Sequence, residues 1–516
     1  MGPMGPSNRA CTAAPWLALA LAVAGCGDPG ASAPRPNVLL VVVDTLRADR
    51  LTAELMPALS GFADEGLRFS GAQSPRAKTT PAVASLFTGL YPPQHGVRDL
   101  TVPLDPALPT LAERFSEAGY ATGAIVGNFV LVKRRAALDR GFDLWVEDLP
   151  QMTGVPPSAV PQRTAGSLTD GALVALGLSA EPSADGAGPS EPLTEGDEPW
   201  FLYLHYMDPH GAYEPPPQFP PVRSAPDLVP PVTSIPRTAL HRPRVATYNV
   251  PESARTMDGG FDAAAVRALY DAEVRFVDAQ LGRLFDSARA AGLLENTLVV
   301  VTSDHGESLG EHLYWFEHGL YAYEATCRVP LVVRFPNNWT ERPVGGTRTS
   351  DVSLPDVAPT LLELLDLEPL PAPDADVPAG VSVAGNWLTG EAGTHPVYSE
   401  KTDSADLDGA VQIVAVRFRD LKLIRRFTFV TEAGGPQLRV LSDELYDLRD
   451  DPGETINRID EAALADWRAR LTADLERYFA GDADLPAVAA RIRARREALR
   501  TDAAQDVQHL QALGYW

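Results

Sequence analysis

The sequence predicts an α/β sandwich with a mostly parallel central sheet, followed by a small C-terminal α+β subdomain. Three largely apolar runs, at residues 37–44, 200–205 and 297–305, predict central strands, because strands buried on both faces read as nearly continuous hydrophobic segments. Residues 264–291 carry apolar side chains at helical spacing. Strands that alternate with helices indicate helices packed on both faces of such a sheet.

The composition is that of a globular, acidic protein. The chain has 516 residues, which allows one large domain and a smaller one, and 45% of them are hydrophobic. The formal net charge is −24, with 68 acidic and 44 basic side chains. Such a surface repels phosphate backbones, so we expect no nucleic-acid partner. It is compatible with an enzyme that holds an anionic substrate through a bound cation.

The first 26 residues predict an export signal. Arg9 precedes an apolar run over residues 13–24, and small residues lead into Cys26. This run is short for a transmembrane helix. The Val-Ala-Gly-Cys sequence resembles the bacterial lipobox, in which the cysteine is lipidated and becomes the mature N-terminus. We therefore expect a lipoprotein attached to a membrane through Cys26, facing the periplasm or the cell surface, with residues 27–36 as its tether. The alternative is an ordinary cleaved signal that contains a cysteine.

Residues 37–390 form the predicted catalytic domain. Two segments interrupt the alternation of strands and helices: residues 151–198 are rich in Pro, Ser, Gly and Ala, and residues 214–256 are rich in Pro. Both predict surface insertions or loops.

Residues 396–516 form the predicted C-terminal subdomain. Residues 413–424 predict two antiparallel strands joined by a tight turn, and residues 460–512 are rich in Ala, Arg and Leu and predict helix.

Polar side chains follow the three predicted strands. Asp44 ends the first run, His210 follows the second, and Asp304 and His305 end the third. Open α/β sheets place their active sites beyond the carboxyl ends of the strands. Carboxylates, imidazoles and a hydroxyl from the segment around Thr79 suit a divalent cation such as Mg²⁺, Ca²⁺, Mn²⁺ or Zn²⁺.

Seven motifs in sequence order carry a resemblance to the sulfatase family of the alkaline-phosphatase superfamily, over residues 36–460. They are RPNVLLVVVDTLRADRL, TTPAVASLFTGLYPPQHGV, FLYLHYMDPHGAYEPP, TSDHGESLGEH, RVPLVVRFP, DVAPTLLELL and ELYDLRDDPGE. The resemblance implies an alkaline-phosphatase-like sandwich and a metal-dependent enzyme that acts on anionic esters.

The family's nucleophile motif, Cys/Ser-x-Pro-Ser-Arg, falls on residues 79–83. Its nucleophile matches Thr79, its proline matches Pro81, and its arginine matches Val83. Sulfatases oxidise Cys or Ser to formylglycine, whereas threonine has an extra methyl group on Cβ and could give only a ketone. A threonine hydroxyl can still act as a nucleophile beside a divalent metal. Thr80 is the competing nucleophile, and a helix cap is the structural alternative for Thr79.

The resemblance also implies the metal and substrate residues. Asp44, Thr79, Asp304 and His305 match metal-ligand positions, with His305 in place of the family's Asn. Thr45 stands where sulfatases usually have a second Asp. His210 matches a substrate-binding and catalytic histidine, His318 stands in the position of the family's Lys, and Asn128 is a candidate oxyanion donor.

One metal ion is expected, and a second is the alternative. His312 and His318 could join Asp208 or His210 around a second cation, and His312 is otherwise a candidate substrate contact. The Asp-x-x-x-His pair of two-metal members is absent, because Asp208 and His210 are two positions apart. His205 is expected to pack at a strand end.

Three functions follow from these residues. The leading hypothesis is a metal-dependent hydrolase or transferase of phosphate esters or diesters with Thr79 as its nucleophile. The second is a sulfuric ester hydrolase of the arylsulfatase type. The third is a binding protein built on an inactive sulfatase scaffold.

Overall fold

The fold is seen in a computed structural model of the chain. It describes residues 34–480 except 101, 150–161, 180–187, 194–195, 239, 341, 344, 372–376, 391–394, 403–409 and 433–434, together with residues 490, 494 and 497. The predicted signal and Cys26 lie outside these residues. Among the helices that are described, none is long and apolar enough to cross a membrane.

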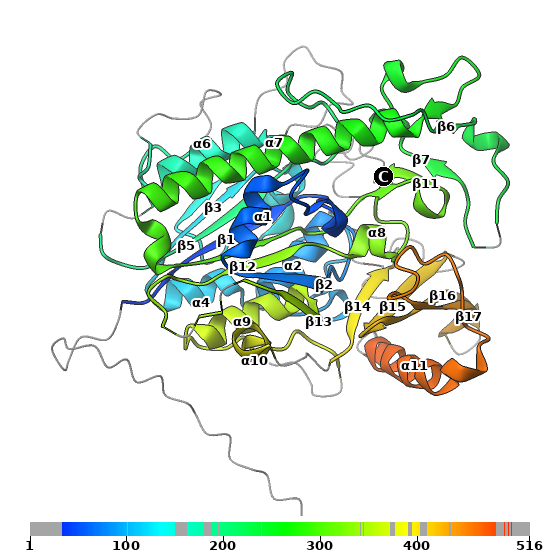
Figure 1. The fold of residues 1–516 in the computed structure, drawn as a ribbon. Coiled ribbons are helices and arrows are strands. Elements are labelled where there is room, and N and C mark those ends of the chain that lie inside the picture. The colour runs from blue at the N-terminus through cyan, green and yellow to red at the C-terminus, as the bar shows by residue number, and fades with distance from the viewer. Residues whose placement is uncertain are drawn as a thin grey trace, which may run out of the picture. The chain divides into compact units, whose positions relative to one another are not determined.

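The centre of the fold is an eight-stranded sheet, in the order β13-β2-β12-β9-β1-β5-β3-β4 (Figure 1). Strands β9, β1, β5, β3 and β4 are parallel neighbours, and β12 is antiparallel to both β9 and β2. The strands are β1 (Asn37–Val43), β2 (Leu67–Gln73), β3 (Ala121–Val126), β4 (Leu144–Val146), β5 (Trp200–Tyr206), β9 (Thr297–Thr302), β12 (Leu331–Arg334) and β13 (Thr347–Ser353). The predicted mostly parallel sheet is confirmed.

The three predicted central strands lie side by side. Strand β1 pairs in parallel with β5 on one side and β9 on the other, so that Val41 stands between Leu204 and Val301. All three residues are fully buried. This burial explains why the runs show no alternation of polar and apolar residues.

Helices cover both faces of the sheet. Val38, Leu40 and Val42 of β1 pack in the core formed with α2 (Thr79–Thr88), α4 (Leu111–Glu117), α9 (Val357–Leu364) and α10 (Ala384–Thr389). Leu39, Val41 and Val43 point to the opposite face and pack in the core formed with α1 (Pro57–Asp64), α6 (Ala165–Ala175) and α7 (Ala263–Ala290). The alternation follows from the two-residue period of a strand.

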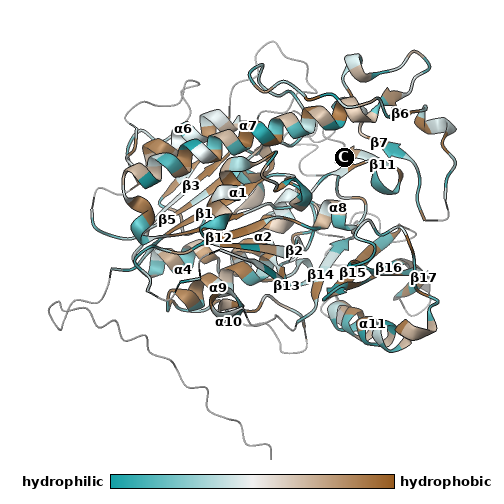
Figure 2. Cartoon of the chain, viewed as in Figure 1, coloured by the Kyte–Doolittle hydropathy of each residue, from teal (hydrophilic) through white to brown (hydrophobic). Residues whose placement is uncertain are grey.

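Helix α7 confirms the predicted helix at residues 264–291. Its N-cap is Asp262, whose side chain accepts hydrogen bonds from the backbone N–H groups of Ala264 and Ala265. Figure 2 shows apolar strands in the centre of the sheet and both apolar and polar residues along α7. The apolar side chains of α7, including Val266, Tyr270 and Leu281, are buried in the core between this helix and the sheet.

The prediction of a surface loop over the whole of residues 151–198 is wrong at α6. Helix α6 begins after Thr164, whose hydroxyl accepts a hydrogen bond from Ser167 N. Leu168, Ala172 and Ala175 then recur at helical spacing and are buried in the core with α7. The small residues that gave the segment its loop-like composition allow α6 to pack closely against its neighbours.

The C-terminal subdomain is a four-stranded antiparallel sheet with one helix. The strands are β14 (Val397–Lys401), β15 (Gln412–Phe418), β16 (Leu421–Glu432) and β17 (Gly435–Asp447), in that order, and the helix is α11 (Ala465–Ala480). The predicted strand pair within residues 413–424 is present as the β15–β16 hairpin. Most of the predicted helix beyond residue 480 lies outside the described residues.

Shorter elements complete the described chain. They are α3 (Pro92–His95), α5 (Lys133–Ala136), α8 (Glu324–Cys327), β6 (Leu228–Val229), β7 (Arg244–Val245), β8 (Phe261–Asp262), β10 (Ser308–Leu309) and β11 (Tyr314–Glu317), with single 3₁₀ turns between them. Three of these 3₁₀ turns and the short strands β6 and β7 lie in the predicted insertion at residues 214–256.

Candidate active site

The sheet order brings the predicted polar residues together. Because β9, β1, β5 and β3 are parallel neighbours, their carboxyl ends meet at one edge. Asp44 follows β1 and Asn128 follows β3, while Asp304 and His305 follow β9. His205 is the penultimate residue of β5. All five residues are shielded from solvent, since none of them is more than 2% exposed.

Thr79 joins the cluster from the first turn of α2. Its Oγ1 lies 3.4 Å from Oδ2 of Asp44 and 3.5 Å from Nε2 of His305. The hydroxyl of Thr80 is buried elsewhere and has no hydrogen-bond partner within the described part of the chain. Between the two threonines, Thr79 is therefore the one in contact with the carboxylate and the imidazole.

Asp44 has one occupied and one open oxygen. Oδ2 accepts hydrogen bonds from Asn128 Nδ2 at 2.6 Å and from Thr79, and it lies 3.4 Å from Nε2 of His205. Oδ1 is buried and accepts no hydrogen bond from any residue that the structure describes. Asn128, a predicted oxyanion donor, is thus committed to Asp44, while its Oδ1 caps the turn at Val130.

Asp304 likewise has one hydrogen-bonded and one open carboxylate oxygen. Its Oδ1 accepts hydrogen bonds from the backbone N–H groups of His305 at 2.8 Å and Thr45 at 3.3 Å. Its Oδ2 lies 3.4 Å from Nε2 of His305 but has no hydrogen-bond donor among the described residues. Thr45, which stands in place of a second acidic ligand, supports Asp304 through its backbone.

These residues fit a divalent cation. Among the described residues, Asp44, Asp304 and His305 form a group whose ligand atoms all lie within 4.8 Å of one another. Two buried carboxylate oxygens without hydrogen bonds are costly unless a charge compensates them. Carboxylate oxygens, an imidazole nitrogen and the Thr79 hydroxyl form a donor set of the kind that Mg²⁺, Mn²⁺, Ca²⁺ or Zn²⁺ accepts.

The electrostatics of the group agree with this fit. Burial opposes ionisation of Asp44, but the hydrogen bond from His205 and the nearby His210 and His305 hold its pKa well below its ordinary value. Burial and the Asp44 carboxylate raise the pKa of Asp304 to about 7, and burial lowers that of His305 to about 4. Two adjacent carboxylates resist being ionised together unless a cation joins them.

His318 and His210 lie next to the group formed by Asp44, Asp304 and His305. The His318 ring lies 4.3 Å from the His305 ring and 5.2 Å from the His210 ring, measured between centroids. Nδ1 of His318 lies 3.2 Å from Oε1 of Glu307, whose Oε2 accepts a hydrogen bond from the hydroxyl of Tyr213. Both predicted histidines are therefore beside the metal-ligand group.

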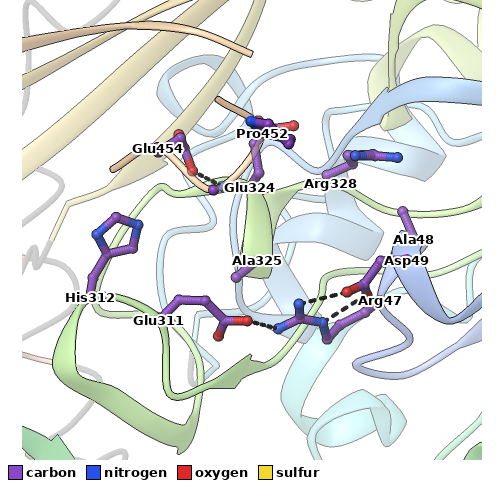
Figure 3. A pocket seen from close by; sticks show the side chains of 11 residues that line it. Arg47, Ala48, Asp49, Glu311, His312, Glu324, Ala325, Arg328, Pro452 and Glu454 are labelled. Carbon is purple, nitrogen blue, oxygen red and sulfur yellow. Dashed lines mark hydrogen bonds and ion pairs between the residues drawn. The ribbon is translucent and has the colours of Figure 1, made fainter. Parts of the chain in front are cut away.

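His312 lies in a different place. Its ring stacks on Tyr323 at 3.6 Å and lies 5.0 Å from the His241 ring. It lines a cavity of about 380 Å³, in which Arg47 is held between Asp49 and Glu311 (Figure 3). The structure does not show His312 in contact with any residue of the Asp44 group that it describes.

The second-cation grouping is only partly assembled, because His210 and His318 lie side by side whereas Asp208 and His312 contact other residues. Asp208 Oδ2 accepts the backbone N–H of Ala165 at the start of α6, and His210 Nδ1 lies 2.9 Å from its neighbouring carbonyl at Gly211. His312 is held by Tyr323 as described above. Asp208 therefore connects the loop after β5 to α6.

Two residues of the site carried no signal in the sequence. His205 was indistinguishable from a packing residue, because it ends an apolar run in which any buried side chain could stand. Glu307 follows the Asp-His-Gly motif and contacts His318, which is 11 positions away along the chain. A helical or strand period could not relate the two, since a loop and the short strands β10 and β11 separate them.

Comparison with known proteins agrees with the motifs and the fold. The family model named Sulfatase matches residues 36–367. This chain belongs to the sulfatase family. It is therefore a sulfatase-like hydrolase with an alkaline-phosphatase-like fold. Enzymes of this family generally depend on a metal ion.

Similar sequences include sulfatases, and a phosphonate monoester hydrolase has a similar fold. The sulfatase YidJ of Escherichia coli strain K12, which is uncharacterised, is 27% identical over 85% of this chain and 86% of its own. A choline-sulfatase of Rhizobium meliloti is 26% identical over 84% of this chain and 86% of its own. The crystal structure of a phosphonate monoester hydrolase of Agrobacterium radiobacter has a TM-score of 0.62 at 22% identity, covering 87% of this chain and 96% of the other.

Proposed function

We propose that this protein is a metal-dependent hydrolase or transferase of phosphate esters or diesters, and that the Thr79 hydroxyl is its nucleophile. The observation that carries the proposal is the position of Thr79 Oγ1, 3.4 Å from Oδ2 of Asp44 and 3.5 Å from Nε2 of His305, the nitrogen that the two open carboxylate oxygens also face. A threonine in this position cannot become formylglycine, the aldehyde on which sulfate ester cleavage depends in this family.

The residues of the site can perform transfer to phosphorus. Oγ1 of Thr79 attacks the phosphorus atom, and the bond between phosphorus and the leaving oxygen breaks. Oδ2 of Asp44 accepts the hydrogen bond from the Thr79 hydroxyl and can accept its proton. Helix α2 begins at Thr79, and the N-terminus of a helix favours an anion because its first backbone N–H groups have no partner within the helix. We assign protonation of the leaving oxygen to His210, whose ring lies 5.2 Å from the ring of His318. Water or an acceptor alcohol then releases the phosphate from Thr79.

Asp44, Asp304, His305 and Thr79 would hold the metal. A divalent cation there lowers the pKa of a coordinated hydroxyl and stabilises the charge that develops on the phosphoryl oxygens. The remaining residues orient these ligands: Asn128 holds Asp44, and the backbone of Thr45 holds Asp304.

The relatives leave a second candidate, a sulfuric ester hydrolase. The choline-sulfatase among them favours it, whereas the phosphonate monoester hydrolase shows that this fold also serves an enzyme of phosphorus esters. We prefer the phosphate ester hydrolase or transferase because of the residue at position 79. A threonine hydroxyl suffices for attack on phosphorus, whereas the formylglycine route to sulfate esters needs Cys or Ser.

The test is an assay with three aryl substrates and two threonine variants. Purified protein is supplied with Mg²⁺, Mn²⁺, Ca²⁺ or Zn²⁺ and given a bis-aryl phosphate, an aryl phosphate and an aryl sulfate. We expect phosphate turnover that falls by at least about 10²-fold in Thr79→Ala, since an essential nucleophile is removed. Mass spectrometry of acid-quenched enzyme should find phosphate on the peptide that contains Thr79.

Thr80→Ala is the matched control. It removes the same hydroxyl from the next residue of the same helix turn, and we expect turnover close to that of the wild type. Turnover of the aryl sulfate alone would support the second candidate. Phosphate turnover that persists in Thr79→Ala would exclude Thr79 as nucleophile, and absence of both turnover and metal binding would favour a binding scaffold.

A further inference from the structure

A buried histidine on the central sheet faces the metal-ligand group without belonging to it. His205 is 0% exposed, and its Nε2 lies 3.4 Å from Oδ2 of Asp44. Its other ring nitrogen, Nδ1, lies 2.8 Å from the hydroxyl of Tyr203, two residues earlier on the same strand. Both nitrogens of the ring are therefore engaged, one by a phenol and one by a carboxylate.

The two partners fix the tautomer of His205. An ionised carboxylate can only accept hydrogen bonds, so the hydrogen on the ring must be on Nε2. Burial raises the pKa of Tyr203 well above its ordinary value, so its hydroxyl keeps its proton and can donate it to Nδ1 of the neutral ring. The strand places both side chains on one face, because residues two apart on a strand point the same way.

His205 and Asn128 together occupy one oxygen of Asp44. Asn128 donates to Oδ2 at 2.6 Å, and His205 approaches the same atom from β5, the strand next to β1. Oδ1 then faces His305 at 3.8 Å and is left without a hydrogen bond among the described residues. A carboxylate held in this way presents a single, defined oxygen to a cation.

We propose that His205, with its tautomer set by Tyr203, is a positioning residue that orients Asp44 as a one-oxygen metal ligand. Hydrogen bonds from outside the ligand shell orient ligands and tune their basicity, and their loss weakens metal binding by about 10- to 100-fold in comparable sites. The proposal concerns the metal site and depends neither on the substrate nor on Thr79 as nucleophile.

Two other roles for His205 are less consistent with its contacts. A direct metal ligand would need a free ring nitrogen near the ligand group, but Nδ1 is occupied by Tyr203, and Nε2 faces the oxygen of Asp44 that already accepts from Asn128. A role in packing alone does not account for the two polar contacts, because an apolar side chain would fill the same buried space without polar atoms that need partners.

The experiment measures metal affinity in variants of the whole protein. Calorimetric titration of the metal-free protein with Mn²⁺, Zn²⁺, Ca²⁺ and Mg²⁺ identifies the cation that binds the wild type most tightly. For that cation we expect His205→Phe, which keeps an aromatic ring but removes both nitrogens, to bind about 10- to 100-fold more weakly. His205→Gln retains an N–H donor on a side chain of similar reach and should recover most of the lost affinity.

Two tyrosines on the same strand supply the comparison. Tyr203→Phe removes the group that sets the tautomer and should weaken binding in the same direction as His205→Phe, by a smaller factor. Tyr206→Phe removes a hydroxyl that bonds Thr169 on α6, away from Asp44, and should leave the affinity unchanged. Thermal unfolding of each metal-free variant separates loss of metal binding from loss of the fold.

Several outcomes would overturn the proposal. They are wild-type affinity in His205→Phe, equal losses in His205→Gln and His205→Phe when both variants are folded, or no binding of any of the four cations by the wild type. If His205→Phe does not fold, the comparison of His205→Gln, Tyr203→Phe and Tyr206→Phe decides the question alone. Failure of the Thr79 assay with intact metal binding would leave this proposal standing.

Discussion

At the scale of single residues, the site depends on which atom of each side chain is already occupied. Asp44 and Asp304 each use one carboxylate oxygen for hydrogen bonds and leave the other open. The open oxygens of Asp44 and Asp304 lie 3.8 Å and 3.4 Å from Nε2 of His305. A methyl group on Cβ of Thr79 separates this residue from the Cys or Ser that matures to formylglycine, and in the proposed function its unmodified hydroxyl attacks phosphorus.

Gly306 lies between His305 and Glu307, and its size matters. A Cβ added there would lie 2.4 Å from the carbonyl oxygen of Ala325, closer than side chains approach a backbone. Gly306→Ala must therefore shift the loop that carries both neighbours. We expect it to lower the free energy of unfolding by about 1–3 kcal/mol and to weaken metal binding, measured by urea denaturation and calorimetry.

Gly61→Ala is the control for that substitution. Gly61 is an exposed residue inside α1, and an added Cβ would meet no described atom within 4 Å. Alanine has the higher helix propensity, so this variant should gain roughly 0.5–1 kcal/mol. A Gly306→Ala protein as stable as the wild type would show that the loop tolerates the shift.

At the scale of elements, α2 places Thr79, the proposed nucleophile, at the end of the sheet. Its first turn contains Thr79 and Pro81, and proline is tolerated there because the N–H that it lacks would have no partner within the helix. All ten residues of α2 are buried, and Val83 packs in the core where the family's motif has an arginine. The charge of the family's arginine is therefore absent from this helix, and an apolar side chain packs in its place.

The segment before β14 is linked to the start of α9 by an ion pair that should respond to pH. Nε2 of His395 lies 3.0 Å from Oδ2 of the fully buried Asp356. Burial opposes protonation of His395, but Asp356 and, further away, Asp351 raise its pKa above the ordinary 6.5. The folded state therefore binds this proton more tightly, so the pair stabilises the protein below pH 6.5 and loses that effect as the pH rises through the folded-state pKa.

We expect His395→Ala to cost about 1–2 kcal/mol at pH 5.5 and less at pH 9, measured as the difference in urea unfolding from the wild type. His241→Ala provides a control of opposite sign, because burial lowers the pKa of His241 to about 4. The neutral form of His241 is favoured in the fold, so its contribution grows as the pH rises. Equal costs of His395→Ala at both pH values would contradict the assignment.

At the scale of the whole molecule, buried ion pairs connect the C-terminal sheet to the catalytic domain. Glu324 of α8 contacts Lys422 and Arg417, and Lys422 also contacts Glu454, each at 2.8–2.9 Å. Removal of one partner from such a network leaves the other charge buried without a counter-charge, which lowers the free energy of unfolding by about 3–5 kcal/mol. These contacts hold the subdomain against the short helix just before β12.

Attachment to a membrane remains a proposal that rests on Cys26 and the apolar run before it. The expected result is that the full-length protein, expressed in a bacterium that processes lipoproteins, sediments with membranes, and that Cys26→Ser releases it to the soluble exported fraction. Ser7→Ala is the control, since it changes the leader but leaves Cys26 intact. Unchanged membrane association of Cys26→Ser would refute lipid attachment at this residue.

Local sequence determined the centre of the fold. Apolar runs marked β1, β5 and β9, helical periodicity marked α7, and the polar residues at the strand ends marked the metal-ligand group. These features are readable because burial on both faces of a strand, or on one face of a helix, leaves a pattern within a few consecutive residues. The nucleophile position at Thr79 came from the family motif, and the structure places it beside Asp44.

Tertiary structure alone decided the contacts between distant segments. His205 and Asp44 are 161 positions apart, and Thr45 and Asp304 are 259 apart, so they meet only because β5 and β9 flank β1. Tertiary packing also left His312 against Tyr323, away from the group, and buried α6 in a segment whose composition resembles a loop. A sequence pattern specifies which face is apolar, whereas strand order and register specify which polar atoms share a site.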